Sequence, residues 1–285
     1  MFGNLMIFRY ERNGEIMRRV KRTTSEEIDK FILQDQEYRF PYHYIFSFSP
    51  YKVNLSNNLR LYSAILLKKV LSRIIEYHHE TGKPLRILDF GCGDGRLIWE
   101  ILKLYNQGML KIKKIVGVDL SERAILFAKA FTYDNRDIVE LYDKDLRKLK
   151  LKDKFDVIVA MEVLEHIPDK DIESTIEALH KLLDDKEIFI ITVPSIFMRK
   201  PKKHYRHYNY NLLREQVNKF FEIQEWYYHI RKFPFELYIR LLSNRFFAIN
   251  SQILLKILDK TFGKLVESQT KKGLNLFAVF VKRKR

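Results

Sequence analysis

Short runs rich in valine and isoleucine alternate with helical patterns along the middle of the chain, and this alternation constrains the fold more than any other feature. The predicted strands cover residues 87–90, 114–118, 137–141, 155–160 and 188–193. The helices predicted between them cover about 95–106, 121–131 and 170–184. Because unbroken apolar runs are typical of strands buried on both faces, the pattern predicts a doubly wound α/β fold around a mostly parallel sheet.

The flanks of this alternation extend the expected sheet to seven strands. Helical periodicity runs over residues 58–80 before the first strand, and a helix over about 210–220 leads into a strand at 221–230. The apolar segment 275–282 is expected to close the sheet at its edge. This arrangement of strands and helices is a Rossmann-like one.

The same pattern divides the chain into three parts. Residues 1–57 are interpreted as an N-terminal hairpin and cap segment, because Asn13-Gly14 is a strong hairpin turn signal. Residues 58–232 are interpreted as the core. Residues 233–285 are interpreted as a helical insertion followed by the final edge strand of the same domain.

Cysteine usage and hydropathy exclude several classes of protein. Cys92 is the only cysteine, so the chain has no disulfide framework and no cysteine-rich zinc site. No run of about 18 uncharged apolar residues exists, which excludes a predicted membrane span. These features predict a cytoplasmic location.

The positive charge of the chain is concentrated near its end. The formal net charge is +16, and residues 196–285 hold 20 of the 52 lysines and arginines but 6 of the 36 aspartates and glutamates. So one-sided a distribution indicates an anionic partner, and a nucleic acid, a membrane surface and an acidic metabolite all stay open. The apolar and basic segment 234–265 suits a peripheral helix on anionic lipid, and equally an ordinary helix covering the sheet.

A glycine-rich turn follows the first predicted strand, where Asp89 precedes Gly91, Gly93 and Gly95. Glycines between a parallel strand and a helix let a ligand approach the backbone closely. The turn lies at the carboxyl end of its strand, where such sheets bind ligands. Arg96 stands where the dinucleotide fingerprint requires its third glycine, and Asp89 suits a cationic ligand better than a pyrophosphate.

The segment LDFGCGDGRL resembles motif I of the class I S-adenosylmethionine-dependent methyltransferases, and the resemblance covers about residues 85–230. In that family the loop holds the methionine part of the cofactor, an acidic residue after the second strand binds the ribose, and a later pair lies beside the adenine. The resemblance therefore implies a methyltransferase fold and an enzyme of the EC 2.1.1 class. It implies these cofactor-binding residues: Asp89, Gly91, Cys92, Gly93, Gly95, Asp119, Leu120, Asp145, Leu146 and Met161.

A second motif, E-x-x-E-H, follows the fourth predicted strand as Glu162, Glu165 and His166. It resembles two metal-dependent families, the ubiquinone-biosynthesis O-methyltransferases and the 3′-terminal 2′-O-methyltransferases of small RNAs. In both families a later histidine contributes, and here His204 and His207 stand in a comparable place. The metal set that this implies, for Mg²⁺ or Mn²⁺, is Glu162, Glu165, His166 and His207.

The catalytic residues expected from this motif are Glu165, His166 and His207. A bound metal ion would polarise an acceptor hydroxyl for attack on the sulfonium methyl. Related small-molecule methyltransferases carry a similar loop without a metal. In that alternative Glu162 faces the cofactor, and His166 braces the loop or, like His207, acts as a general base.

Together these features predict an S-adenosylmethionine-dependent O-methyltransferase acting on a small-molecule or lipid-like acceptor. The aromatic segment around Tyr42, His43 and Tyr44 is expected either to line the acceptor pocket or to pack the cap on the core. An RNA 2′-O-methyltransferase and a non-catalytic protein that keeps the fold are the alternatives. The sequence names neither the acceptor nor an oligomeric state.

Overall fold

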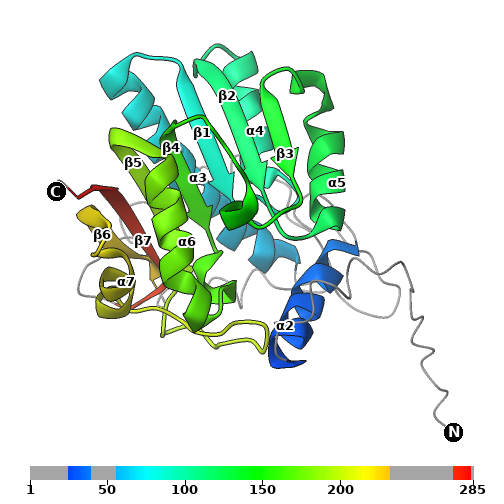
Figure 1. Ribbon diagram of the computed structural model, residues 1–285, viewed down its shortest axis with the longest axis vertical. Coiled ribbons are helices and arrows are strands. Elements are labelled where there is room, and N and C mark those ends of the chain that lie inside the picture. Colours follow the sequence, from blue (N-terminus) through cyan, green and yellow to red (C-terminus); the bar gives the residue numbers. More distant parts are fainter. Residues whose placement is uncertain (1–24, 40–55, 232–271, 284–285) are drawn as a thin grey trace, which may run out of the picture.

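The computed structural model describes residues 25–39, 56–231 and 272–283, which fold around one seven-stranded sheet (Figure 1). Its strands are β1 (Leu85–Phe90), β2 (Ile112–Val118), β3 (Val139–Tyr142), β4 (Phe155–Met161), β5 (Leu183–Pro194), β6 (Phe221–Arg231) and β7 (Gly273–Lys282). Their order in the sheet is β3-β2-β1-β4-β5-β7-β6. The first five strands are parallel, and β7 runs antiparallel to both β5 and β6. The predicted doubly wound, mostly parallel sheet is confirmed.

Helices cover both faces of the sheet. The apolar cluster on one face takes in residues from three helices, α3 (Ser56–Thr81), α4 (Arg96–Asn106) and α5 (Glu122–Phe131). The cluster on the other face takes in α6 (Asp169–Leu182) and α7 (Tyr210–Val217). Two elements, α2 (Ser25–Asp35) and η1 (Gln36–Arg39), precede α3 in the chain and pack outside these layers.

The central strands are apolar on both faces because each face meets a different helical layer. In β4, Val157 and Val159 belong to one apolar cluster, and Ile158 and Ala160 belong to the other. All four side chains are fully buried. This double burial explains why the strand reads as an unbroken apolar run, without the alternation of a half-exposed strand.

The prediction that residues 275–282 form an edge strand is wrong. This segment is β7, which lies between β5 and β6, so that β6 is the strand at the edge. Five consecutive residues of β7, from Leu276 to Phe280, are fully buried, as an interior strand requires. In contrast, β6 has a register irregularity between Ile223 and Glu225, and such bulges and charged side chains are typical of edge strands.

Other predictions differ from the structure in detail or fall outside it. Strand β5 begins at Leu183, several residues before the predicted start, because α6 passes into it directly. The predicted hairpin at Asn13-Gly14, the aromatic segment 40–51 and the helices at 234–265 lie outside the described residues. Within the described part of the chain, no helix is long and apolar enough to cross a bilayer.

Candidate functional site

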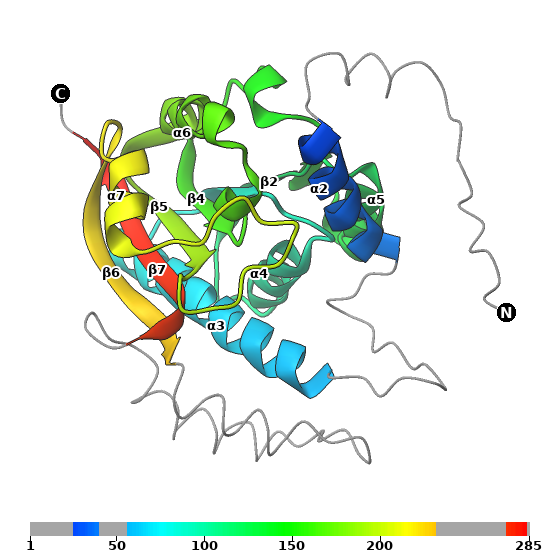
Figure 2. The ribbon, with the colours of Figure 1, turned by 90° about the horizontal axis from the view of Figure 1, so that it is seen from below.

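The candidate site lies at the carboxyl ends of the parallel strands. Because β1, β2 and β4 are parallel neighbours, the segments that follow them meet at one edge of the sheet. Figure 2 looks toward this edge, with α2 lying beside α5. The glycine turn, the residues after β2 and the E-x-x-E-H segment are therefore brought together, as the sequence predicts.

The glycine turn follows β1 directly and takes a backbone course that favours glycine. Gly91, Gly93 and Gly95 have φ angles of 75°, 53° and 80°. A Cβ added at Gly91 would lie 2.3 Å from Cγ2 of Val163, so that even alanine would displace the segment after β4. The turn is thus both conformationally and sterically restricted to glycine at this point.

Two carboxylates flank this turn. The backbone N–H groups of Gly93 and Ser121 donate to the two oxygens of Asp119, at 3.0 and 2.9 Å. Asp89 is buried, and its Oδ2 has no hydrogen-bond partner among the described residues. Burial, with the nearby charge of Asp119, raises the pKa of Asp89 to about 8. A buried carboxylate without a partner is a site for a cationic group of a ligand.

The other predicted cofactor residues have differing surroundings. Cys92 is buried in the core, and burial raises its pKa well above the ordinary value. Both oxygens of Asp145 accept hydrogen bonds from the guanidinium of Arg147. Leu146 is buried in the core and Leu120 is 50% exposed. Met161 is partly buried at the end of β4. Their contacts with a cofactor stay predictions.

Three ligand-bearing side chains gather beyond the end of β4. The ligand atoms of Glu165, His166 and His204, here called the Glu–His cluster, all lie within 4.8 Å of one another. Oε2 of Glu165 is buried, and no hydrogen-bond partner for it lies in the part of the chain that the structure describes. Burial, followed by the charge of Glu162, raises the pKa of Glu165. Burial lowers the pKa of His166 to about 3 and that of His204 to about 2. Both imidazoles are therefore neutral near pH 7, with a lone pair available to a proton or a cation.

His207 acts on this cluster through His204. Nδ1 of His207 lies 3.1 Å from the carbonyl oxygens of Ser195 and Met198, which can only accept, so this nitrogen carries the hydrogen. Nε2 of His207 then accepts from Nδ1 of His204 at 2.9 Å. This chain of bonds leaves the lone pair of His204 on Nε2. The cluster thus contains His204 where the sequence predicts His207, and His207 orients it.

Glu162 also differs from its expected role as a metal ligand. Its Oε1 accepts hydrogen bonds from Asn275 at 2.9 Å and from Thr192 at 3.2 Å, and so connects the end of β4 to β7 and β5. Its φ angle is 57°, which is uncommon for a residue other than glycine. Within the described residues, Glu162 is not a member of the Glu–His cluster.

The segment after β5 holds the cluster in place. The backbone N–H of Tyr205 donates to the carbonyl of Glu165 at 2.8 Å, and Nη1 of Arg206 donates to the carbonyl of Leu164 at 2.9 Å. Tyr205 and Arg206, like Asp35 and Lys203 discussed below, form no recognisable motif. Sequence reasoning missed them because only the fold brings them to the site.

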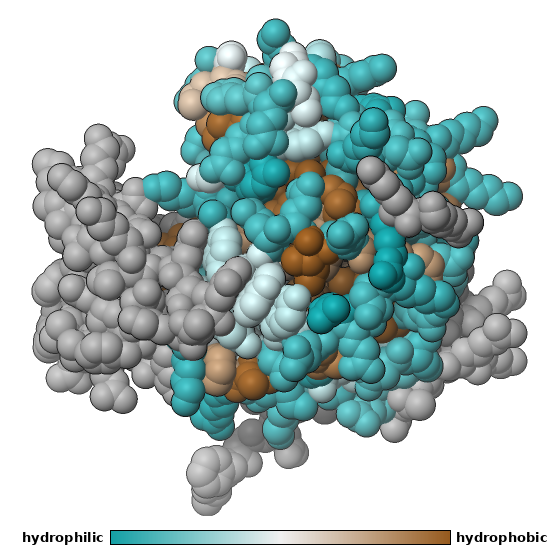
Figure 3. Space-filling view, turned by 90° about the vertical axis from the view of Figure 1, so that its left-hand side faces the viewer, coloured by the Kyte–Doolittle hydropathy of each residue, from teal (hydrophilic) through white to brown (hydrophobic). Residues whose placement is uncertain are grey.

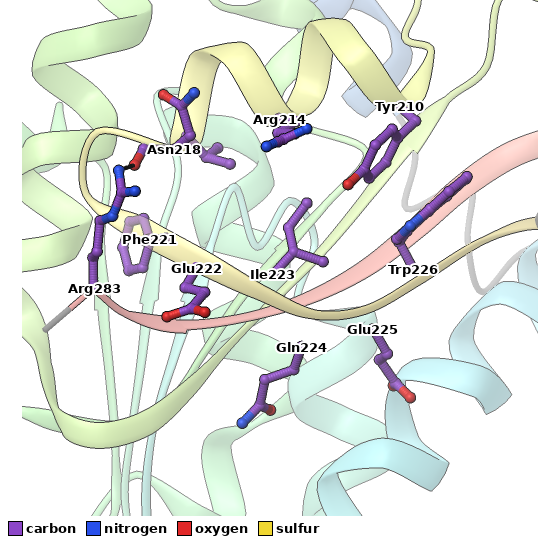
Figure 4. A pocket seen from close by; sticks show the side chains of 11 residues that line it. Tyr210, Arg214, Asn218, Phe221, Glu222, Ile223, Gln224, Glu225, Trp226 and Arg283 are labelled. Atoms are coloured by element: carbon purple, nitrogen blue, oxygen red, sulfur yellow. Dashed lines mark hydrogen bonds between the residues drawn. The ribbon is translucent and has the colours of Figure 1, made fainter.

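A separate hollow of about 540 Å³ lies between the edge strand β6 and helix α7 (Figures 3 and 4). Its lining includes Trp226 and Tyr210, whose rings stack with centroids 4.0 Å apart, together with Arg214, Glu222 and Arg283. Figure 3 shows apolar side chains gathered on this face and surrounded by hydrophilic ones. No residue of the glycine turn or of the Glu–His cluster lines this hollow.

The sheet order, the glycine turn and its flanking carboxylates define a class I S-adenosylmethionine-dependent methyltransferase domain. The chain belongs to the methyltransferase domain family, whose sequence profile matches residues 62–238.

Two curated relatives match part of the chain. A ubiquinone biosynthesis O-methyltransferase from Pelagibacter ubique (strain HTCC1062) is 34% identical over 110 residues, which are 38% of this chain and 42% of that protein. A ubiquinone biosynthesis O-methyltransferase from Rhodopseudomonas palustris (strain BisA53) is 31% identical over 85 residues, or 30% of this chain and 31% of that protein. The chain thus spans less than half the length of these relatives.

Two solved structures share the fold over most of their length. Magnesium protoporphyrin IX methyltransferase (ChlM) from Synechocystis PCC 6803, with bound S-adenosylmethionine, has a TM-score of 0.54 at 15% identity, covering 92% of this chain and 100% of that one. The N-methyltransferase NodS from Bradyrhizobium japonicum WM9, in complex with S-adenosyl-l-homocysteine, has a TM-score of 0.53 at 13% identity, covering 90% and 99%. At these identities the similarity concerns the fold alone.

Proposed function

We propose that the protein transfers the methyl group of S-adenosylmethionine to an oxygen atom of a small-molecule or lipid-like acceptor. The observation that carries the proposal is the Glu–His cluster, which lies at the same edge of the sheet as the glycine turn. A hydroxyl must lose its proton to become a strong nucleophile. An O-methyltransferase therefore needs a base that takes the proton or a cation that stabilises the alkoxide. The partial similarity to ubiquinone biosynthesis O-methyltransferases supports oxygen as the methylated atom.

The donor set of the cluster fits a divalent metal ion. Glu165 offers a buried oxygen without a partner, and His166 and His204 offer neutral imidazoles. One carboxylate with two imidazoles suits Mn²⁺ better than Mg²⁺, which prefers oxygen ligands throughout. When bound, such an ion supplies the charge that stabilises an acceptor alkoxide.

The residues of the chain have separate tasks in the transfer. Asp89 and Asp119 bind the cofactor and fix the direction in which its methyl group points. The activated oxygen attacks the methyl carbon in line, and the electron pair of the broken C–S bond stays on sulfur, which gives a neutral thioether. Where the cluster holds no ion, Nε2 of His204 accepts a hydrogen bond from the acceptor hydroxyl and orients it, because the lowered pKa of His204 makes it too weak a base to remove the proton alone. His207 keeps that nitrogen unprotonated beforehand.

The proposal is tested by methyl transfer from labelled S-adenosylmethionine to a catechol probe, 3,4-dihydroxybenzoate, and to phenols with a prenyl tail. We expect Glu165→Gln and His204→Asn to lower turnover by about 100-fold while the affinity for S-adenosylhomocysteine changes less than about twofold. Glu173→Gln is the matched control, because Glu173 pairs with Lys219 on the surface. Full turnover in His204→Asn would contradict the assignment.

Treatment with a chelator distinguishes the metal-dependent form of the proposal from the metal-free form. If an ion takes part, EDTA abolishes turnover and Mn²⁺ restores it, and calorimetry shows Mn²⁺ binding to the protein with S-adenosylhomocysteine bound. If activity persists in EDTA, no ion takes part and His204 acts by orienting the acceptor hydroxyl; since the pKa of His204 is lowered to about 2, its protonation should not limit turnover near neutral pH.

A second candidate is RNA methylation, favoured by one observation. Five of the eight residues from Arg199 to Arg206 are lysine or arginine, and this segment contains His204 of the cluster. An RNA acceptor would bind through its phosphates, so affinity for a single-stranded oligonucleotide would fall steeply between 50 and 200 mM salt. A small neutral acceptor would show almost no salt dependence.

A further inference from the structure

The α2–η1 segment lies at the carboxyl edge of the sheet (Figure 2). It contacts the residues that follow β2 and also the segment that carries His204. Tyr38, in η1, is 5% exposed. Its hydroxyl lies 2.5 Å from the position that a Cβ on Gly93 would occupy. The hydroxyl thus packs against the second glycine of the turn, next to the place where the methionine part of the cofactor is expected.

One side of the segment is attached beside Asp119. Asp35 accepts a hydrogen bond from the hydroxyl of Ser121 and forms an ion pair with Arg123 at 3.4 Å. Asp119 binds the backbone N–H of the same Ser121. Asp35, the last residue of α2, and Asp119, the expected ribose-binding carboxylate, therefore both accept a hydrogen bond from Ser121.

The other side is attached to the segment that carries His204. Nζ of Lys203 lies 2.6 Å from Oε2 of Glu37, the residue before Tyr38. Lys30 in α2 donates to the backbone oxygen of Lys202 at 3.0 Å. Lys203 directly precedes His204, a member of the Glu–His cluster. The Glu37–Lys203 ion pair thus connects η1 to the residue next to His204.

We propose that Tyr38 is a cofactor-contacting residue and that the Glu37–Lys203 ion pair is a positioning device that holds it over the glycine turn. The hydroxyl of Tyr38 donates to the carboxylate of the cofactor's methionine part, which is an acceptor group of the right charge. Because Lys203 is attached to the cluster, the same pair links retention of the cofactor to the placement of His204. The inference rests on the proposed cofactor but not on the identity of the acceptor.

The experiment measures the affinity and dissociation rate of S-adenosylhomocysteine, which needs no acceptor. Tyr38→Phe keeps the ring and removes the hydroxyl, and we expect a loss of affinity of about 5- to 20-fold. Glu37→Gln and Lys203→Met should each speed dissociation several-fold at low salt. Glu177→Gln is the control, because Glu177 is exposed and its ion pair with Lys181 stays within α6, which is outside the α2–η1 segment.

Charge reversal distinguishes the ion pair from a general structural role. Glu37→Lys and Lys203→Glu should each speed dissociation, and the double variant should return the rate to within about twofold of the unmodified protein. Raising the salt concentration should speed dissociation in the unmodified protein and have little effect in Glu37→Gln.

Two results would overturn the inference. One is a Tyr38→Phe protein that binds and releases S-adenosylhomocysteine like the unmodified protein. The other is a double reversal that behaves as the sum of its single variants. If the unmodified protein binds no S-adenosylhomocysteine, the cofactor assignment itself fails, which is a different outcome from either of these.

Discussion

At the scale of single residues, the site is defined by buried acidic groups that form no ion pair with a lysine or arginine in the described part of the chain. The pKa values of Asp89, Asp119 and Glu165 are all raised, and burial is the largest cause in each case. Such groups destabilise a folded chain unless a ligand compensates them. In the proposed function, the ammonium group of S-adenosylmethionine would supply positive charge beside Asp89, and its ribose hydroxyls would donate to Asp119.

The raised pKa of Asp89 predicts that cofactor affinity depends on pH. The ionised carboxylate binds the cationic group, but in the folded protein it forms only as pH approaches about 8. Affinity for S-adenosylhomocysteine should therefore increase up to about tenfold per pH unit between pH 6 and 7.5 and level off above 8. Calorimetry measures this, and Asp89→Asn should bind weakly at every pH. An affinity independent of pH in the unmodified protein would contradict the prediction.

The same shift has the opposite sign for stability. The unfolded chain loses the proton of Asp89 near pH 3.8, whereas the folded chain keeps it to about pH 8. The contribution of Asp89 to the free energy of unfolding is therefore fully present below pH 3.8 and decreases as pH rises toward 8. Asp89→Asn should remove this part of the pH dependence in the cofactor-free protein.

At the scale of elements, the strand ends opposite the site are joined by a buried ion pair. Asp156 of β4 is 2% exposed and accepts two hydrogen bonds from the Arg86 side chain in β1, at 3.1 and 3.0 Å. Lys83 lies 2.9 Å from the same carboxylate. This network fixes β1 against β4 at the far end of the sheet from the glycine turn.

Asp156→Ala should lower the free energy of unfolding by about 3 kcal/mol, because Arg86 and Lys83 lose their buried partner and Arg86 keeps only the more exposed Asp184. Urea denaturation measures the loss, with an unchanged dependence on denaturant. Asp153→Ala is the control, since Asp153 is half exposed in its pair with Lys114 and its removal should change stability by less than about 1 kcal/mol. A loss no larger than that of the control would contradict this account.

The positions of helices and strands along the chain were predictable from the sequence wherever local residue patterns determine them. Apolar runs located every strand of the sheet, and the glycine turn located the edge that carries the site. The position of β7 was not predictable, because the order of strands in a sheet depends on contacts between distant segments. His204 and His207 are three residues apart, and only the carbonyls of Ser195 and Met198 decide which one is turned toward Glu165.

At the scale of the whole molecule, the cofactor site depends on contacts from elements far apart in the chain. Four segments meet at one edge of the sheet: the glycine turn, the end of β2, the E-x-x-E-H segment and the α2–η1 segment. The two apolar clusters pack on the faces of the sheet beneath them. A ligand that binds only this assembled edge stabilises the entire fold by mass action.

S-adenosylhomocysteine at 100 times its dissociation constant should therefore raise the free energy of unfolding by about 2.7 kcal/mol. For a chain of this size the melting temperature should rise by about 5 °C, as measured by differential scanning fluorimetry. Asp119→Asn should lose most of this increase, whereas Asp134→Asn, at an exposed position, should keep it. An equal increase in the Asp119→Asn protein would place the ribose elsewhere.

The interior position of β7 determines the order in which the chain can assemble during synthesis. Among the strands that the structure describes, β6 pairs with β7 alone, and β7 also covers the outer side of β5. Within this described sheet, residues 221–231 therefore leave the ribosome before the strand with which they pair, and the side of β5 that β7 covers stays open until residues 273–282 emerge. A nascent chain stopped before that point would expose two unpaired strands at once, and a chaperone or protease that recognises extended apolar segments would find its substrate there.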